Sequence, residues 1–352
     1  MRIHVTDAKP GDILQSDTYN SFGLLILGKG TELKPDDLAK FLQHGIDYID
    51  VDTGMESSSS GSDLDDDAFL IESYSRVKPL FLEAFDTFEA MFVEAAQTGV
   101  FDEYIVTAAM MPLTTELNNH RDVVSLLLLL DKRDEYTYKH SLQVGVLSYY
   151  IALWMGYSQE EAYVIGKAGY MHDIGKSMIP PAILNKPGKL TPDEYEEMKR
   201  HAQLGYDIIL NSTNDEISAL VALQHHERED GKGYPHGLVK EQIHPYARIV
   251  AVADVYSAMS SNRVYQNKQE LLSVLRELYQ LSFGQLNAEV TQAFIRHMLP
   301  NFIGKRVLLT NGESGVIIHN NAIDYFRPLV QTERGFVDLA SERSLAIDEI
   351  YM

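Results

Sequence analysis

The sequence predicts a mainly α-helical protein with a small α+β module at its N-terminus and a small antiparallel β-barrel at its C-terminus. Apolar residues recur three and four positions apart through most of residues 68–302, which is typical of amphipathic helices. Residues 1–52 and 303–352 instead contain short apolar runs of strand character between turn residues. A stretch rich in serine and aspartate, residues 53–67, separates the first module from the helices.

Composition limits the partners that we expect. The chain of 352 residues is long enough for two or three domains, and its formal net charge is -21. Such a surface repels the phosphates of nucleic-acid polymers and anionic membranes. The absence of cysteine excludes disulfides and thiolate ligands. The N-terminus does not resemble a signal peptide and the longest aliphatic run, residues 123–130, is too short for a bilayer, so we expect a cytoplasmic protein without membrane contact.

The N-terminal module, residues 1–52, carries no cluster of catalytic side chains. Its apolar runs predict strands at residues 3–5, 23–27 and 48–51, and Pro35 opens a predicted helix over residues 34–43. We expect this module to dock a regulatory protein. Residues 53–67, with Ser-Ser-Ser-Ser-Gly-Ser followed by an aspartate-rich run, predict a flexible acidic linker because few of their side chains can be buried.

Residues 68–130 predict a helical segment that braces the rest of the helices. Four phenylalanines between Phe81 and Phe92 lie at helical spacing, a stripe that either packs in the core or forms the seam of a homodimer. We expect a homodimer from this stripe. A second helix is predicted over residues 104–111 and is expected to stop at Pro112, with a further helix reaching Leu130.

The helical domain over residues 131–302 contains the candidate site, centred on residues 171–176, Met-His-Asp-Ile-Gly-Lys. Its neighbours upstream place His172 in a buried stripe, with Asp173 beside it. A capping box at residues 191–194 starts the helix that we expect to carry His201. One buried histidine is most often an ordinary core residue. Seven N and O ligands on neighbouring helices would leave many polar atoms unsatisfied without metal, so we predict a metal site formed by His140, His172, Asp173, His201, His225, His226 and Asp254.

The C-terminal module, residues 303–352, contains four apolar runs with a period of two, separated by Asn-Gly and similar turns. This pattern predicts the small antiparallel barrel. It has no cluster of candidate ligands, so we interpret it as an appendage for interaction or stability.

The loop after the paired histidines identifies the family that this chain resembles. Residues 227–238 read Glu-Arg-Glu-Asp-Gly-Lys-Gly-Tyr-Pro-His-Gly-Leu. Together with the His-Asp pair and the two adjacent histidines, the Gly-Tyr-Pro sequence resembles the HD-GYP family of metal-dependent phosphodiesterases. These bacterial proteins hydrolyse the messenger cyclic di-guanosine monophosphate (cyclic di-GMP). The motifs span residues 134–263, about a third of the chain, and imply an all-helical HD-type metal-binding bundle.

The resemblance implies a role for each matching residue. Lys176 would contact a phosphate oxygen or the bridging water, Gly233 and Tyr234 would line the nucleotide pocket, and Arg263 would bind the ligand. Glu227 is expected to orient a ligand histidine. One metal would be held by His140, His172, Asp173 and Asp254, and the second by Asp173, His201, His225 and His226, with Asp173 bridging the two.

Two departures from the family pattern modify these expectations. Some members hold a third metal through a glutamate four residues before the first histidine, where this chain has Tyr136, so we expect two metals. The family also has a proline and a basic residue after the ligand-binding arginine, where this chain has Val264 and Gln266. We expect these two substitutions to weaken the outer phosphate contact and to lower affinity more than turnover.

The expected activity is hydrolysis of cyclic di-GMP to linear pGpG, with either pGpG or GMP as the final product, by attack of a metal-bridging hydroxide in which Asp173 and Lys176 take part. Two divalent ions lower the pKa of a shared water and neutralise phosphoryl charge. Imidazole-rich ligation suits Fe, Mn, Co, Ni or Zn better than Mg or Ca, and among these metals we expect Fe or Mn. Two alternatives stay open at this point: a cyclic di-GMP receptor with weak turnover that signals through its accessory domains, and a phosphohydrolase of the broader HD class that acts on another nucleotide.

Overall fold

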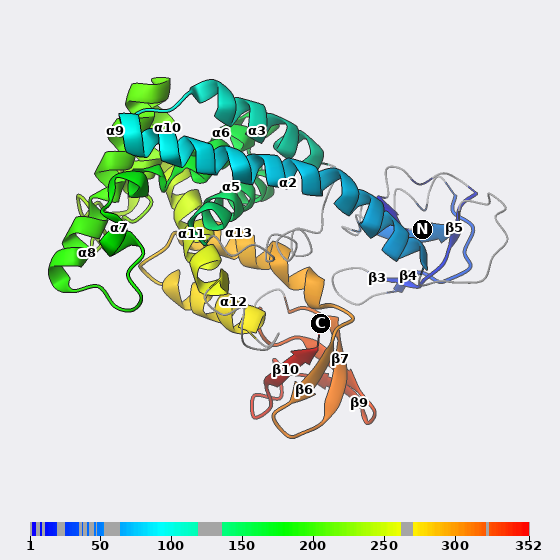
Figure 1. Cartoon of the computed structure of the whole chain (residues 1–352). Helices are drawn as coiled ribbons and strands as arrows, with labels where there is room; N and C mark the ends of the chain where they lie inside the picture. The colour runs from blue at the N-terminus through cyan, green and yellow to red at the C-terminus, as the bar shows by residue number, and fades with distance from the viewer. Residues whose placement is uncertain are drawn as a thin grey trace. The chain divides into compact units, whose positions relative to one another are not determined.

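The computed structural model describes residues 64–118, 136–261, 270–321 and 324–351. Within the first 63 residues it describes residues 2–4, 8, 11–19, 25–34, 37, 41, 46 and 48–52. The chain divides into two compact units, residues 1–67 and 68–352 (Figure 1).

The first unit contains two small antiparallel sheets. One has the strand order β1-β5-β2 and the other pairs β3 with β4. A separate apolar core is built around the fully buried side chains of Leu14, Phe41 and Val51. Most of the helix predicted over residues 34–43 lies outside the described residues. The strands are β1 (Arg2–His4), β2 (Ile13–Leu14), β3 (Thr18–Tyr19), β4 (Leu25–Leu27) and β5 (Tyr48–Asp52).

Helix α2 (Leu64–Thr98) begins inside the predicted linker, because residues 64–67 form its first turn. Its phenylalanine stripe packs within the chain. Phe88 is fully buried and its ring meets that of Tyr170 edge-on at 5.2 Å, and Phe85 meets Tyr138 at 5.8 Å. The stripe therefore belongs to the core and gives no support to a homodimer seam.

Helix α3 (Glu103–Leu117) passes through Pro112 without a break, so the predicted stop at this proline is wrong. The proline removes one backbone donor. However, Val106, Met110, Leu113 and Leu117 on one face of α3 are all fully buried, and this packing outweighs the lost hydrogen bond. The further helix predicted to reach Leu130 lies outside the described residues.

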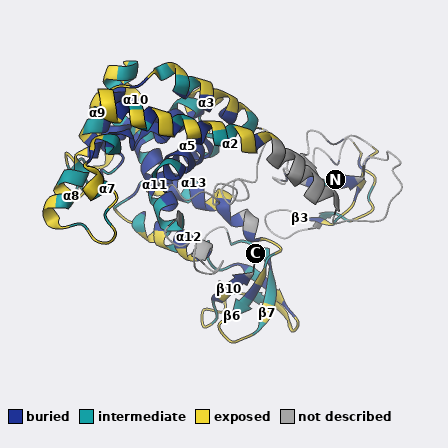
Figure 2. Cartoon of the chain, in the orientation of Figure 1, coloured by how far each residue is buried: buried dark blue, intermediate teal, exposed yellow. Residues whose placement is uncertain are grey.

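The central bundle is built on a close crossing of α5 (Tyr136–Trp154) and α6 (Gln159–Met171). Glycines allow this contact: a Cβ at Gly145 would lie 2.9 Å from the Tyr170 Cβ, and one at Gly169 would lie 2.7 Å from the Ser148 hydroxyl. Figure 2 shows buried residues gathered on α5, α11 and α13 in the interior of the bundle. The remaining elements are η3 (Ile174–Met178), α7 (Pro181–Leu184), α8 (Pro192–Lys199), α9 (His201–Thr213), α10 (Glu216–Gln224), η4 (Lys240–Gln242), α11 (Pro245–Ser261), α12 (Glu270–Leu281), α13 (Ala288–Met298) and η5 (Leu299–Phe302).

The C-terminal module is a five-stranded antiparallel sheet with the order β10-β6-β7-β8-β9. Among the described residues β9 and β10 each pair on one side only, so the sheet is open and the prediction of a barrel is wrong in this respect. Val307 and Val330 join the same apolar core as the helices. The strands are β6 (Arg306–Leu309), β7 (Ser314–His319), β8 (Leu329–Thr332), β9 (Gly335–Asp338) and β10 (Ile347–Tyr351).

Among the described helices, none combines the length and the apolar character that a membrane span requires.

Candidate functional site

All seven predicted ligands converge inside the bundle. They form two groups in which the candidate ligand atoms lie within 4.8 Å of one another. Six of the seven residues are buried, and His226 is half-buried. The first group is His140, His172 and Asp254, and the second is Asp173, His201, His225 and His226.

The ligands come from different elements, mostly from helix ends. His172 directly follows α6, and His225 directly follows α10. The capping box at Thr191 is present and starts α8 as predicted, but α8 ends at Lys199. His201 is the first residue of the next helix, α9, so its predicted place within the capped helix is wrong.

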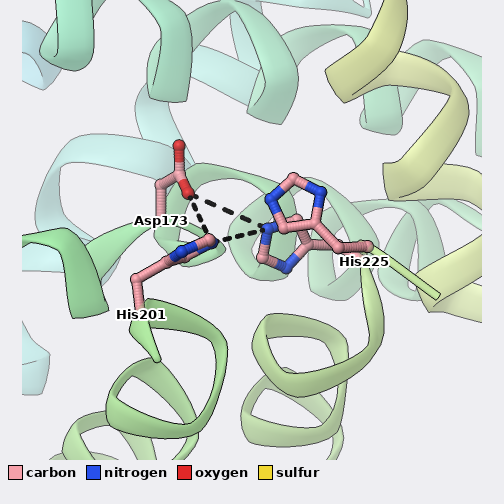
Figure 3. Close-up of side chains that lie close together, drawn as sticks. Asp173, His201 and His225 are labelled. Carbon is pink, nitrogen blue, oxygen red and sulfur yellow. Dashed lines mark hydrogen bonds and ion pairs between the residues drawn. The ribbon is translucent and has the colours of Figure 1, made fainter. Parts of the chain in front are cut away.

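Asp173 lies between the two groups, and each of its carboxylate oxygens faces one of them. Oδ2 is 3.3 Å from Nε2 of His172 and 3.7 Å from Nε2 of His140. Oδ1 is 3.4 Å from Nε2 of His201 and 3.8 Å from Nε2 of His225. Figure 3 shows His201 and His225 turned toward this carboxylate. The geometry is that of a carboxylate able to bridge two cations.

Backbone carbonyls fix the orientation of three of the rings. Nδ1 of His172 donates to the Gly169 carbonyl at 2.6 Å, and Nδ1 of His225 donates to the Ala222 carbonyl at 2.8 Å. Nδ1 of His201 donates to the carbonyl of Met198 at 2.6 Å. Each acceptor lies three residues earlier, in the last turn of a helix, where carbonyls run out of helical N–H partners. The opposite nitrogen, Nε2, therefore presents its lone pair to the cluster.

His140 lies within α5 and has a different support. Its Nδ1 is 2.9 Å from the hydroxyl of Ser257, which itself donates to the side-chain oxygen of Gln143 at 3.0 Å. Because the hydroxyl proton is used in that second bond, the serine oxygen accepts from Nδ1 of His140. Nε2 of His140 is left to face Asp254, whose Oδ1 is 3.0 Å away. Sequence reasoning missed Ser257 and Gln143, since their pattern alone does not distinguish them from other buried polar residues.

The Nε2 atoms of the histidines lie at distances that suit a shared cation. Nε2 of His201 and Nε2 of His225 are 3.4 Å apart, although both rings use their Nδ1 proton elsewhere. Two neutral rings so arranged have no proton to share. Metal–nitrogen bonds of about 2.0–2.1 Å place adjacent ligand atoms roughly 3 to 3.4 Å apart. Nε2 of His172 and Oδ1 of Asp173 are also buried without a hydrogen-bond partner, as expected for metal ligands.

The electrostatics favour the protonation states that bind metal. Burial lowers the pKa of His201 to about 4 and that of His226 to about 3. Burial raises the pKa of Asp173, but the charges of Lys176 and His172 outweigh this and hold it well below its usual range. At neutral pH His201 and His226 are thus neutral and Asp173 is ionised, which are the forms that coordinate divalent ions. Burial lowers the pKa of His172 as well, but there the carboxylates of Asp173 and Asp254 raise it by more.

Lys176 stands at the edge of the cluster. Its ammonium contacts Oδ2 of Asp173 at 2.5 Å, and its side chain is 21% exposed, whereas that of Asp173 is 1% exposed. The positive charge can therefore reach both the cluster and a ligand that enters from solvent.

Gly175 brings this segment against the next ligand. A Cβ at this position would lie 2.0 Å from the carbonyl oxygen of His201 and 2.4 Å from the nitrogen of Gly205. Only glycine allows η3 to approach the start of α9 this closely.

The loop that follows the paired histidines folds back over them. A Cβ at Gly233 would lie 2.5 Å from the carbonyl oxygen of His226, so this close return requires glycine. The ring of Tyr234 packs on the ring of His226 with centroids 4.6 Å apart. The loop therefore lines the mouth of the cluster.

Glu227 holds the loop rather than a ligand histidine, which corrects its expected role. The residue is 3% exposed, and its carboxylate accepts from the backbone N–H groups of His236 at 2.7 Å and Leu238 at 2.8 Å. One buried side chain thus joins the start of the loop to its end.

Some predicted residues fall outside the description. Arg263, Val264 and Gln266 lie within residues 262–269, which are not among the described residues. Tyr136 begins α5, but its side chain is not described.

Comparison with known proteins identifies the helical domain. Residues 125–282 match the HD domain family model. The chain is 34% identical over 245 residues to a cyclic di-GMP phosphodiesterase of Pseudomonas aeruginosa, an alignment that covers 69% of this chain and 58% of that protein. It is 49% identical over 131 residues to a cyclic di-GMP phosphodiesterase response regulator of Xanthomonas campestris, covering 37% of this chain and 35% of the relative.

A third relative has a different substrate in its name. The chain is 32% identical over 210 residues to a 3'3'-cGAMP-specific phosphodiesterase of Vibrio cholerae, covering 59% of this chain and 47% of that protein. The chain spans about a third to three-fifths of the length of these relatives.

Proposed function

Because the chain belongs to the HD-GYP family of HD domain proteins, we propose that it hydrolyses cyclic di-GMP to linear pGpG, with either pGpG or GMP as the final product. The observation that carries this proposal is the position of Asp173 between two groups of histidines, with one carboxylate oxygen toward each. That arrangement matches the needs of a binuclear metallohydrolase.

The residues present fit two divalent cations. His140, His172 and Asp254 would hold one, and His201, His225 and His226 the other, with Asp173 shared between them. When bound, such a pair acidifies a shared water and neutralises charge on the phosphoryl oxygens. Six of these seven ligands lie at buried positions. The imidazole-rich donor set favours Fe or Mn over Mg or Ca.

Other residues of the chain would bind and orient the phosphodiester. Lys176 would exchange its contact with Asp173 for a nonbridging phosphate oxygen, where its charge stabilises the transition state. Burial raises the pKa of Tyr234, so its phenol stays protonated and can donate a hydrogen bond. Gly233 would let the loop approach the nucleotide, and Arg263 is proposed to contact the ligand from its segment downstream of Asp254.

The experiment is turnover of cyclic di-GMP by protein loaded anaerobically with Fe or Mn, with metal content measured on the same sample. We expect about two metals per chain and linear pGpG as the first product. The matched variant is Asp173→Asn, which preserves volume but removes a charge, and we expect it to lose both metal and turnover. Full turnover by this variant would refute the bridging role.

The same assay distinguishes the alternative functions. The similarity to a 3'3'-cGAMP-specific phosphodiesterase makes cGAMP the second substrate to test. The alternative is a receptor with weak turnover, which is suggested by Val264 and Gln266 in place of the family's proline and basic residue. Such a receptor would retain cyclic di-GMP without releasing pGpG.

We also propose a cytoplasmic location and an N-terminal module that docks a regulatory protein, and the homodimer stays a prediction without a structural basis in the phenylalanine stripe. The acidic, cysteine-free composition and the small separate core of the first unit support the location and the docking role. Light scattering of the full chain tests the dimer, which a monomer mass at micromolar concentration would refute.

A further inference from the structure

A short series of ring contacts leads from the metal cluster to the protein surface. The Tyr234 ring, which packs on His226, meets the ring of Tyr195 edge-on with centroids 6.4 Å apart and planes at 80°. The Lys199 ammonium lies 5.4 Å from the centroid of Tyr195 and 5.9 Å from that of Tyr234. Tyr195 and Lys199 belong to α8, and neither is a candidate metal ligand.

Helix α8 places these two side chains firmly beside the site. It begins with a capping box in which Thr191 and Glu194 bond reciprocally, and Lys186 holds Glu194 by an ion pair at 2.5 Å. At its other end a single residue separates it from His201, whose ring donates to the α8 carbonyl of Met198. The position of α8 is therefore linked to that of His201, a candidate metal ligand.

This helix buries none of its side chains within the chain. Tyr195 is 49% exposed although it stands at the mouth of a deep cluster. Lys199, one helical turn later, contacts Glu196 at 2.6 Å, but the side chain of Glu196 is 68% exposed. Exposed pairs of this kind contribute little to stability, so Lys199 can exchange this contact for one with a ligand.

The chemistry of this surface suits a purine. A nucleobase stacks on aromatic side chains with a gain of about 1–3 kcal/mol per base. Guanine presents O6 and N7 as adjacent acceptors, and a lysine ammonium is a common donor to them. In a chain with a net charge of -21, a lysine held over two aromatic rings beside the cluster also offers local attraction for an anionic nucleotide.

We propose that Tyr195 and Lys199 form the wall of the nucleotide pocket, where one guanine base of the cyclic dinucleotide stacks on Tyr195 and directs its O6 and N7 toward Lys199. The inference rests on the proposed function and extends the site to α8. Because α8 leads directly into His201, the base would be held in a fixed position relative to the metal-ligand cluster.

The test measures KM, kcat and equilibrium binding of cyclic di-GMP for metal-loaded protein. We expect Tyr195→Ala to raise KM and Kd about tenfold or more, the ratio that corresponds to 1.4 kcal/mol of lost stacking, while kcat falls less than threefold. Tyr195→Phe keeps the ring and should stay within about twofold of the unmodified protein. Lys199→Met should raise KM about threefold to tenfold. Tyr104→Ala is the matched control, since this tyrosine is 76% exposed on α3.

A second substrate separates base binding from general damage. Methyl p-nitrophenyl phosphate is a phosphodiester without a purine, and the loss of kcat/KM in Tyr195→Ala should be at least fivefold larger on cyclic di-GMP than on this compound. Equal losses on both substrates, or a KM for cyclic di-GMP unchanged within twofold, would overturn the role of Tyr195 while leaving the proposed hydrolysis intact. If the unmodified protein binds cyclic di-GMP without cleaving it, turnover fails and the Kd values decide the inference. If it neither binds nor cleaves cyclic di-GMP, both fail.

Discussion

The carboxylate of Glu227 allows a quantitative prediction, because it is a buried anion with two identified backbone donors. In Glu227→Gln the amide oxygen still accepts one of the two hydrogen bonds. The new NH2 group faces the other backbone N–H, that of His236 or Leu238, which then has no acceptor. A hydrogen bond to a charged group contributes about 1.5–3 kcal/mol, and a buried donor without a partner costs about 1–3 kcal/mol. We therefore expect the closed loop to lose about 3 kcal/mol.

Hydrogen exchange of backbone amides measures this loss without reference to activity. A loss of about 3 kcal/mol corresponds to roughly a hundredfold increase in the open population of the loop, and the amides of His236 and Leu238 should exchange faster by that ratio. The kcat/KM for cyclic di-GMP should fall by much less than this ratio, because the closed loop that carries Tyr234 remains the major population. Bound metal should be retained, since His225 is oriented by its own carbonyl contact.

Asp230→Asn is the matched control. Asp230 also accepts from a backbone N–H of this loop, that of Lys232 at 3.0 Å, but it lies on the surface. Water can replace its contacts, so the variant should cost less than about 1 kcal/mol. Unchanged exchange in Glu227→Gln, or an equally large acceleration in Asp230→Asn, would refute the view that burial makes Glu227 the anchor of the loop.

Three further variants test the framework of the site. Gly175→Ala should lower the melting temperature and the bound metal together, because the added methyl meets the carbonyl of His201. Asp173→Ala should reduce metal from about two ions per chain to less than one by elemental analysis. Asp215→Asn should destabilise the fold by about 1–2 kcal/mol in urea unfolding at pH 7, since it weakens an N-cap and the ion pair with Lys167 at 2.9 Å. Burial raises the pKa of Asp215, but its hydrogen bonds lower the pKa by more, so the folded value lies below the unfolded value near 3.9. The stability difference between the unmodified protein and Asp215→Asn should therefore shrink as pH falls below about 4.

The convergence of the ligands was predictable because the residues next to each ligand in the sequence already indicate that it is buried. His140 shares a helical face with Val144 and Leu147, and Asp254 lies in an apolar run, so each side chain was expected in the interior. Interior polar groups need partners, and the only common partner for so many ligands was metal. This reasoning requires no knowledge of how the helices pack.

The errors arise where a tertiary contact overrides a local signal. The capping box at Thr191 predicted the start of α8, but no local pattern marked its end at Lys199, and His201 begins the next helix, where Gly175 packs closely against it. Pro112 signalled a stop, yet the buried face of α3 carries the helix through it. The sequence did not indicate a role for Tyr195, because a single tyrosine on a polar helix is common. Its position beside the site depends on the loop that brings Tyr234 next to it.

The positions of the histidines at helix ends have a consequence for charge as well as for orientation. His172, His201 and His225 each follow the last turn of a helix, and the ring of each donates a hydrogen bond to a carbonyl of that turn. The C-terminal end of a helix carries a partial negative charge of about half an electron, which attracts cations. The carbonyls that fix these rings thus belong to three helix ends that add negative potential at the same place. His140, in the middle of α5, lacks both effects and depends on Ser257 instead. In the group of His201, His225 and His226, two rings therefore donate to carbonyls of helix ends. In the group of His140, His172 and Asp254 only His172 does so, and the carboxylate of Asp254 adds negative charge.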